Sequence, residues 1–146
     1  MFSGQYLTYA EYRSLGGTLE ETPFNLLEYE ARKQIDLRTQ RRLIDLDTIP
    51  NEVKLCDFHL ISKIESFANT IQSTSQNNIT QETIDGYSVA YLSPSEINNI
   101  VSSKNFELQD IMMTDLYGVI VNNEHIIYNG AKWSQIKKSR FIIKLV

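Results

Sequence analysis

The chain has 146 residues, of which 42% are apolar and 22% are charged, with a formal net charge of −4 and a single cysteine. This length suits one domain with a sizeable core, and the net acidity excludes a uniformly basic nucleic-acid-binding protein. The lone cysteine excludes an intramolecular disulfide, so we expect a reducing compartment. No apolar run is long enough to span a bilayer, and residues 1–13 lack the basic and apolar regions of a secretory signal.

Charges of like sign are grouped along the chain. Residues 1–31 and 47–131 are mainly acidic, whereas residues 32–46 and 132–146 each carry five basic side chains. Sorting of this kind predicts surface patches of opposite sign. Such patches could meet within one molecule, between copies of it, or on a polyanion.

The first predicted helix runs over residues 9–15. Thr8 and Glu11 have the spacing of a capping box, in which the hydroxyl and the carboxylate each accept a hydrogen bond from a backbone amide. Gly16 and Gly17 follow, and glycine adopts the positive φ of a helix C-terminus without strain. These signals predict a short helix with sharply defined ends.

A second helix is predicted with Thr22 as its N-cap and Pro23 at its first helical position. Its apolar residues recur every three or four positions, and the pattern predicts a helix that continues to about Asp45. The apolar stripe consists of Phe24, Leu27, Ala31 and Ile35.

A third helix is predicted to begin near Pro50 and to end at the polar stretch "STSQNN". Its apolar stripe consists of Val53, Cys56, Leu60, Ile64, Phe67 and Ile71.

A β-hairpin is expected near residues 79–91, because Asp85-Gly86 is a turn signal and apolar residues alternate with small ones after it.

Ser93 and Glu96 predict a second capping box, which opens a helix that carries Ile97, Ile100 and Val101. The stretch "FELQDIMMTDLYG" predicts one further helix that ends at Gly118. Beyond it, "VIVNNEHIIY" contains two short apolar runs around an Asn-Asn turn. Asn129-Gly130 is another turn signal, and "RFIIKLV" favours a strand.

The predicted fold class is therefore mainly α (α+β). We expect a bundle of four to five helices with an embedded β-hairpin and a strand-like C-terminal extension. The corresponding division is a helical domain over residues 1–118 and a basic, β-rich extension over residues 119–146.

The sequence contains few residues suited to catalysis. His59 and His125 lie in different predicted elements and are expected on the surface, and Cys56 lies on an apolar stripe and is expected in the core. No spacing of Cys, His, Asp or Glu resembles a zinc or calcium site, and the paired glycines do not form a phosphate-binding loop. We therefore predict no enzymatic activity, no metal and no cofactor; an active site assembled across subunits is the least favoured hypothesis.

A cluster of basic residues is predicted on the second helix. Arg38 and Arg42 are four positions apart and would share a helix face, with Lys33 and Arg41 beside them. The face of Arg38, Arg41 and Arg42 could contact DNA phosphates, line a DNA channel or meet another subunit. The favoured interpretation is a solvated face, or one that pairs with acids such as Glu28 and Glu30 or with acids of a neighbouring copy.

The C-terminal residues mix basic and apolar side chains, and we identify them as candidates for partner docking. They are Trp133, Lys137, Lys138, Arg140, Phe141, Ile142 and Ile143. The last predicted strand could pair with the preceding hairpin of the same chain. It could also add to a sheet edge of another protein or another copy.

Three segments, in this order, resemble the head–tail connector (adaptor) proteins of tailed bacteriophages. They are "YLTYAEYRSLGGTLEETPFNLLEYEARKQID", "LDTIPNEVKLCDFHLI" and "IDGYSVAYL". The resemblance covers roughly residues 5–117. Many adaptors stop soon after the last helix, whereas this chain continues through a basic extension to Val146.

The resemblance implies a mainly helical structural protein of the virion neck, assembled in the host cytoplasm, without enzymatic activity or cofactor. Adaptors form rings, commonly of twelve copies, that dock beneath the portal protein and extend the channel through which DNA leaves. The ring also seats the next neck component, a head-closure (stopper) or tail protein, and the DNA passes close by without specific binding. No membrane association is expected. The alternative function is a DNA-binding regulatory protein that uses the face of Arg38, Arg41 and Arg42.

Overall fold

The computed structural model describes residues 3–77, 79–84, 87–91 and 93–127. The helices of this part of the chain are α1 (Tyr9–Ser14), α2 (Glu21–Arg38), α3 (Asn51–Asn77) and α4 (Pro94–Leu116). Two antiparallel hairpins accompany them, β1 (Ile79–Ile84) with β2 (Tyr87–Tyr91), and β3 (Ile120–Val121) with β4 (Glu124–His125). The predicted class, mainly helical with an embedded β-hairpin, is confirmed.

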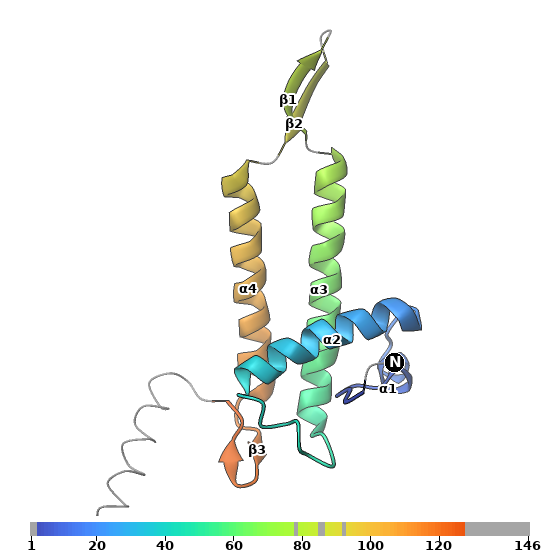
Figure 1. Cartoon of the computed structure of the whole chain (residues 1–146), viewed down its shortest axis with the longest axis vertical. Helices are drawn as coiled ribbons and strands as arrows, with labels where there is room; N and C mark the ends of the chain where they lie inside the picture. Colours follow the sequence, from blue (N-terminus) through green and yellow to red (C-terminus); the bar gives the residue numbers. More distant parts are fainter. Residues whose placement is uncertain (1–2, 78, 85–86, 92, 128–146) are drawn as a thin grey trace, which may run out of the picture.

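The longest elements, α3 and α4, lie side by side and antiparallel (Figure 1). The β1–β2 hairpin connects them at one end of the molecule. Near the other end α2 crosses over α3, with α1 beside it, while β3 and β4 follow α4. This arrangement leaves α2 packed on only one part of the long α3–α4 pair, which we call the proximal half; the half next to the β-hairpin is the distal half.

One continuous core joins the segment before α1, the helices and the residues after β4. The stripe of α3 is buried as predicted at Val53, Cys56, Leu60 and Ile64. The core also contains Tyr6, Leu7, Tyr12, Phe24, Ala31, Ile35, Leu43, Ile61, Leu108, Met112, Leu116, Ile126 and Ile127. Residues 119–127 thus share a core with the helices, and the later part of the predicted extension, 128–146, lies outside the described residues.

The predicted capping box of α1 is confirmed. The Thr8 side chain accepts a hydrogen bond from the Glu11 amide, and the Glu11 carboxylate accepts one from the Thr8 amide. The helix then ends as predicted, with Gly16 at a φ of 96°. This short helix places Tyr12 against Phe24 of α2, with 4.7 Å between ring centroids, and so fixes α1 on the core.

The start of α2 differs from the prediction. Its N-cap is Glu20, not Thr22, and the first helical hydrogen bond runs from the Phe24 amide to the Glu20 carbonyl. Pro23 is therefore the third helical residue. Its missing N–H costs nothing there, because the first amides of a helix have no intrahelical partner.

The predicted continuation of α2 to Asp45 is wrong, since the helix ends at Arg38. Gln40 and Arg41 adopt φ values of 54° and 60°, which reverse the chain direction. The reversal brings Leu43 into the core, where its side chain is fully buried. Burial of that leucine favours a turn over further helical hydrogen bonds, and helical periodicity alone gives no sign of this.

Two other boundaries differ from the predictions. α3 continues through most of "STSQNN" to Asn77, and α4 is one continuous helix instead of two. The junction residues Ser102–Asn105 contain no Gly or Pro, so a helix can pass through them at small cost. The predicted Ser93–Glu96 capping box is present at the start of α4.

Both hairpins agree with their sequence signals. β1 and β2 pair from Ile79 with Tyr91 to Ile84 with Tyr87, and the predicted turn at Asp85-Gly86 lies outside the described residues. In the second hairpin Asn122 and Asn123 have φ values of 52° and 64°, the two positive angles of a type I′ turn. None of the described helices is long and apolar enough to cross a membrane.

We predict that Gly17→Ala disrupts the packing of α1. A Cβ at this position would lie 2.2 Å from ring atoms of the buried Tyr12, so the ring must move. We expect the free energy of unfolding to fall by about 3 kcal/mol, with a changed near-UV circular dichroism spectrum.

Gly16→Ala is the matched control. A Cβ there meets nothing within 4 Å, and only its positive φ is unfavourable. The expected loss is about 1 kcal/mol with an unchanged near-UV spectrum. Equal effects of the two substitutions on the spectrum would contradict the proposed steric contact with Tyr12.

Candidate functional site

The three predicted basic residues do not share a helix face, because α2 ends at the first of them. Arg38 turns toward α4, where its Nη2 donates to Sδ of Met113 at 2.6 Å. Arg42 donates from Nη1 to the His125 carbonyl at 2.8 Å. Arg41 alone of the three lies on an open hollow, so the structure separates the predicted face into three environments.

The hollow beside Arg41 has a volume of about 470 Å³. Its lining residues are Ser3, Tyr29, Arg32, Lys33, Asp36, Leu37 and Arg41. The Arg32 guanidinium and the Lys33 ammonium lie 5.5 and 5.4 Å from the centroid of the Tyr29 ring. Around this hollow the three cations Arg32, Lys33 and Arg41 outnumber the single carboxylate of Asp36. The surface of the hollow is therefore basic, which agrees with the grouping of basic residues at positions 32–46.

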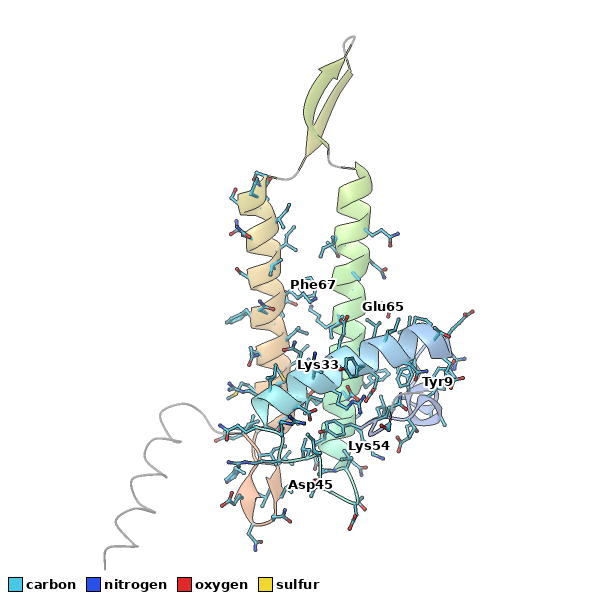
Figure 2. The ribbon with its side chains drawn as sticks, in the orientation of Figure 1. Tyr9, Lys33, Asp45, Lys54, Glu65 and Phe67 are labelled. Carbon is cyan, nitrogen blue, oxygen red and sulfur yellow. The ribbon has the colours of Figure 1, made fainter. Side chains whose placement is uncertain are left out.

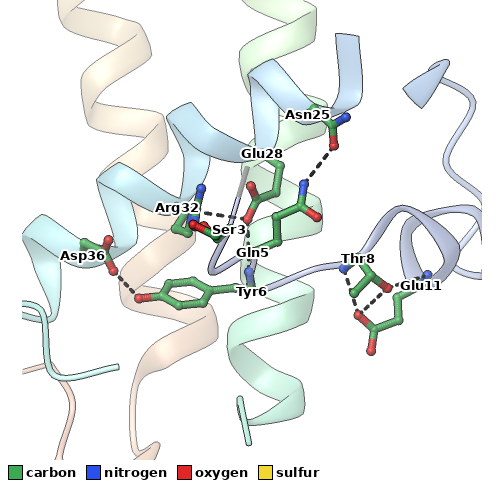
Figure 3. Close-up of polar contacts among 9 residues, drawn as sticks. All are labelled: Ser3, Gln5, Tyr6, Thr8, Glu11, Asn25, Glu28, Arg32 and Asp36. Atoms are coloured by element: carbon green, nitrogen blue, oxygen red, sulfur yellow. Dashed lines mark hydrogen bonds and ion pairs between the residues drawn. The ribbon is translucent and has the colours of Figure 1, made fainter. Parts of the chain in front are cut away.

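Polar contacts attach the N-terminal segment to α2 (Figure 3). The Tyr6 amide donates to Oε1 of Glu28 at 3.1 Å, and Nη1 of Arg32 donates to the Ser3 carbonyl at 2.7 Å. The Tyr6 hydroxyl donates to the Asp36 carboxylate. Burial and this carboxylate both raise the pKa of the Tyr6 hydroxyl above its ordinary value.

A pair of buried carboxyl groups lies where α2 crosses α3. Glu28 and Asp57 are both fully buried. The two carboxyl groups interact, and each alters the pKa of the other. Arg32 contacts Glu28 with 3.5 Å between Nε and Oε1, but Oε2 of Glu28 and both Oδ atoms of Asp57 have no donor. Three unsatisfied buried oxygens would be costly if both groups were ionised.

Burial raises the pKa of Asp57 well above its usual range, and the neighbouring Glu28 carboxylate raises it further. Burial also raises the pKa of Glu28, against the opposing effect of the Arg32 guanidinium. A neutral Asp57 can donate one hydrogen bond to Oε2 of Glu28, while Oε1 stays on Arg32 and the Tyr6 amide. The pair can therefore hold one proton between α2 and α3.

This pair was not predicted from the sequence, in which Glu28 was interpreted only as an acid able to pair with the basic cluster. A signal was nevertheless present. Glu28 is four positions after Phe24 and three before Ala31, and so lies on the apolar stripe of α2. Asp57 lies between Cys56 and Leu60 on the buried face of α3, so both carboxylates interrupt apolar stripes that face each other.

The remaining predicted residues have ordinary environments. His59 is exposed and contacts Asp115, with 2.7 Å between Nδ1 and Oδ2, and His125 is exposed on β4 as expected. Cys56 is buried as predicted, and burial raises the pKa of its thiol. Among the described residues no group of three or more Asp, Glu, His or Cys could hold a metal ion. The docking candidates lie outside the described residues: Trp133, Lys137, Lys138, Arg140, Phe141, Ile142 and Ile143.

The apolar stripes of α3 and α4 continue into the distal half, where α2 does not cover them. Phe67 lies on the side of α3 that faces α4 (Figure 2). Further along, Ile71 is 45% exposed, and Ile97 and Val101 of α4 are 48% and 45% exposed. These three residues, which we call the distal apolar stripe, lie in line with buried residues of the proximal half.

Comparisons with protein-family models, with curated proteins and with solved structures gave no match to this chain.

We predict that the Glu28–Asp57 pair makes stability depend on pH. Because folding raises both pKa values, the native state keeps a proton that the unfolded chain releases. The contribution is complete below the ordinary carboxyl pKa and is lost as pH rises through the raised pKa of the pair. Asp57→Asn should flatten this alkaline loss, because an amide donates to Glu28 without titrating. At alkaline pH it should raise the free energy of unfolding by about 1–3 kcal/mol.

Urea unfolding of both proteins across a pH series measures the effect. Asp110→Asn is the matched control, since Asp110 is exposed on α4 and its neutralisation should leave the wild-type pH profile unchanged. An Asp57→Asn protein whose stability declines with pH as steeply as that of the wild type would contradict proton sharing.

Proposed function

We propose that this chain is a structural protein of a bacteriophage neck. Copies of it form a ring that joins the portal to a head-closure or tail protein and extends the DNA exit channel. The observation that carries the proposal is the distal apolar stripe at Ile71, Ile97 and Val101, which α2 leaves uncovered within one copy. The resemblance of residues 5–117 to adaptor proteins agrees with this assignment.

The distal stripe supports assembly for a physical reason. Two helices side by side can bury only their facing edges, and helices normally need a further element to cover their apolar stripes. In the proximal half, α2 provides that cover. In the distal half a neighbouring copy can provide it, and a contact between two different surfaces of each copy generates a ring when its rotation closes.

Other features of the chain suit a passive conduit. The described residues contain no metal-binding cluster, and the two histidines lie in separate exposed positions. Acidic segments predominate over residues 47–131, which include the distal half. An acidic surface repels DNA phosphates and so allows DNA to pass without being held.

We predict that Ile97→Asp prevents ring assembly without unfolding the protein. Ile97 is half exposed in a single copy, so its replacement should change the free energy of unfolding by no more than about 0.5 kcal/mol. A charge in the distal stripe would remain unpaired when a neighbour covers it. Negative-stain images and native mass measurements of the chain mixed with a portal ring report the assembly.

Ser102→Asp provides the matched control, because Ser102 is exposed on the same helix but lies away from the stripe. We expect closed rings of many copies for the wild type and for Ser102→Asp, and none for Ile97→Asp. A wild-type chain that does not bind the portal ring would refute the proposed function. Rings formed by Ile97→Asp would refute the role of the distal stripe.

We predict that deletion of residues 132–146 leaves a helical protein that fails to join portal-bearing heads. The deletion removes five basic residues and the apolar side chains proposed to dock on a partner. Co-sedimentation with heads measures attachment. A chain with a Gly/Ser segment of equal length in place of residues 132–146 distinguishes sequence from length, and normal attachment of the truncated protein would disprove the docking role.

A further inference from the structure

A second uncovered apolar surface lies on α2. The inner face of this helix is buried against the core at Phe24, Glu28, Ala31 and Ile35. The opposite face carries Leu26 and Leu37, whose side chains are 56% and 74% exposed, with the exposed Glu30 and Lys33 between them. We call these four residues the outer stripe of α2. In Figure 1, α2 lies in front of α3 with no other described element over it.

The spacing of the outer stripe is that of a coiled-coil seam. Steps of four, three and four residues separate Leu26, Glu30, Lys33 and Leu37. This alternation keeps all four side chains along one edge of a helix over about 16 Å. An ordinary solvated helix face has no need of large apolar residues at both ends of such a seam.

The outer stripe is complementary to itself. If a second α2 packs antiparallel, with the two-fold axis level with the middle of the stripe, Leu26 faces Leu37 of the second copy. Glu30 then faces Lys33 of the second copy. The same two contacts repeat on the other side of the axis, which is the defining property of an isologous interface. A parallel arrangement in register would instead place Glu30 against Glu30 and Lys33 against Lys33.

We propose that two copies of the free chain form an antiparallel dimer through the outer stripes of α2. Two Leu26–Leu37 contacts exclude water at the ends, and two Glu30–Lys33 ion pairs fix the register between them. Within one copy, the ammonium group of Lys33 lies 5.4 Å from the centroid of the Tyr29 ring, and the side chain of Lys33 is exposed. A pair of single helices makes a small interface, so the dimer is weak and reversible.

The dimer is independent of the proposed ring. A two-fold contact closes on itself and joins only pairs of copies, so it cannot generate a ring alone. It uses α2 in the proximal half, whereas the ring contact uses the distal stripe. Ile97→Asp should therefore leave the dimer intact. The effect of substitutions in the outer stripe on dimerisation can be measured without any portal protein.

Sedimentation velocity of the full chain, at concentrations up to about 100 µM, tests the proposal, since weak interfaces need such concentrations. Glu30→Lys and Lys33→Glu each replace two ion pairs with two like-charge contacts. Each should raise the dimer dissociation constant by about tenfold. The double variant Glu30→Lys/Lys33→Glu restores opposite charges across the axis and should return the dissociation constant to the wild-type value.

Asp47→Lys makes the same charge change as Glu30→Lys at an exposed position between α2 and α3, and should leave dimerisation unchanged. A wild-type chain that stays monomeric over the whole range would overturn the proposal. Single variants that weaken association without rescue in the double variant would also overturn it, because the charges would then face a different surface or a different partner.

Discussion

The buried contact between Glu28 and Asp57 is the constraint on which the rest of the structure depends. It lies at the crossing of α2 and α3, and the same Glu28 carboxylate accepts the Tyr6 amide and contacts Arg32. Through Arg32 the network reaches the Ser3 carbonyl, so it joins the N-terminal segment to both helices. Buried polar groups of this kind tolerate few alternative arrangements, because a shift would break hydrogen bonds that the apolar interior cannot replace. This network therefore fixes the crossing angle of α2 and its position along α3.

The position of α2 decides which surfaces remain uncovered. α2 covers the proximal half of α3 and leaves the distal apolar stripe exposed on the α3–α4 pair. Its own outer stripe faces away from the core with Leu26 and Leu37 exposed. The two surfaces have different proposed uses. The outer stripe matches itself and is proposed to form a closed pair, whereas the distal stripe is proposed to meet an unlike surface of a neighbouring copy in a ring.

Much of the local structure could be predicted because its causes are local. The capping boxes at Thr8 and Ser93 each need only a residue pair three positions apart. The Asn122-Asn123 turn needs only two residues that tolerate positive φ. The candidate sites were harder to predict. The arginine cluster was assigned to one helix face from periodicity, but the chain turns after Arg38. The carboxyl pair was not predicted, because a charged residue within an apolar stripe suggests an exposed side chain when each helix is considered alone.

The sequence by itself determined the helical class, the α1 and α4 caps, the embedded hairpin and the buried stripe of α3. Hydrogen bonds between near neighbours and the periodic spacing of apolar residues govern these features, and both are already present within each segment. Only the tertiary structure decided where α2 ends, that Glu28 meets Asp57, and which apolar residues stay exposed. These outcomes depend on contacts between residues far apart in the sequence. Burying Leu43 and pairing two carboxyl groups across helices outweigh the weak preferences of each local segment.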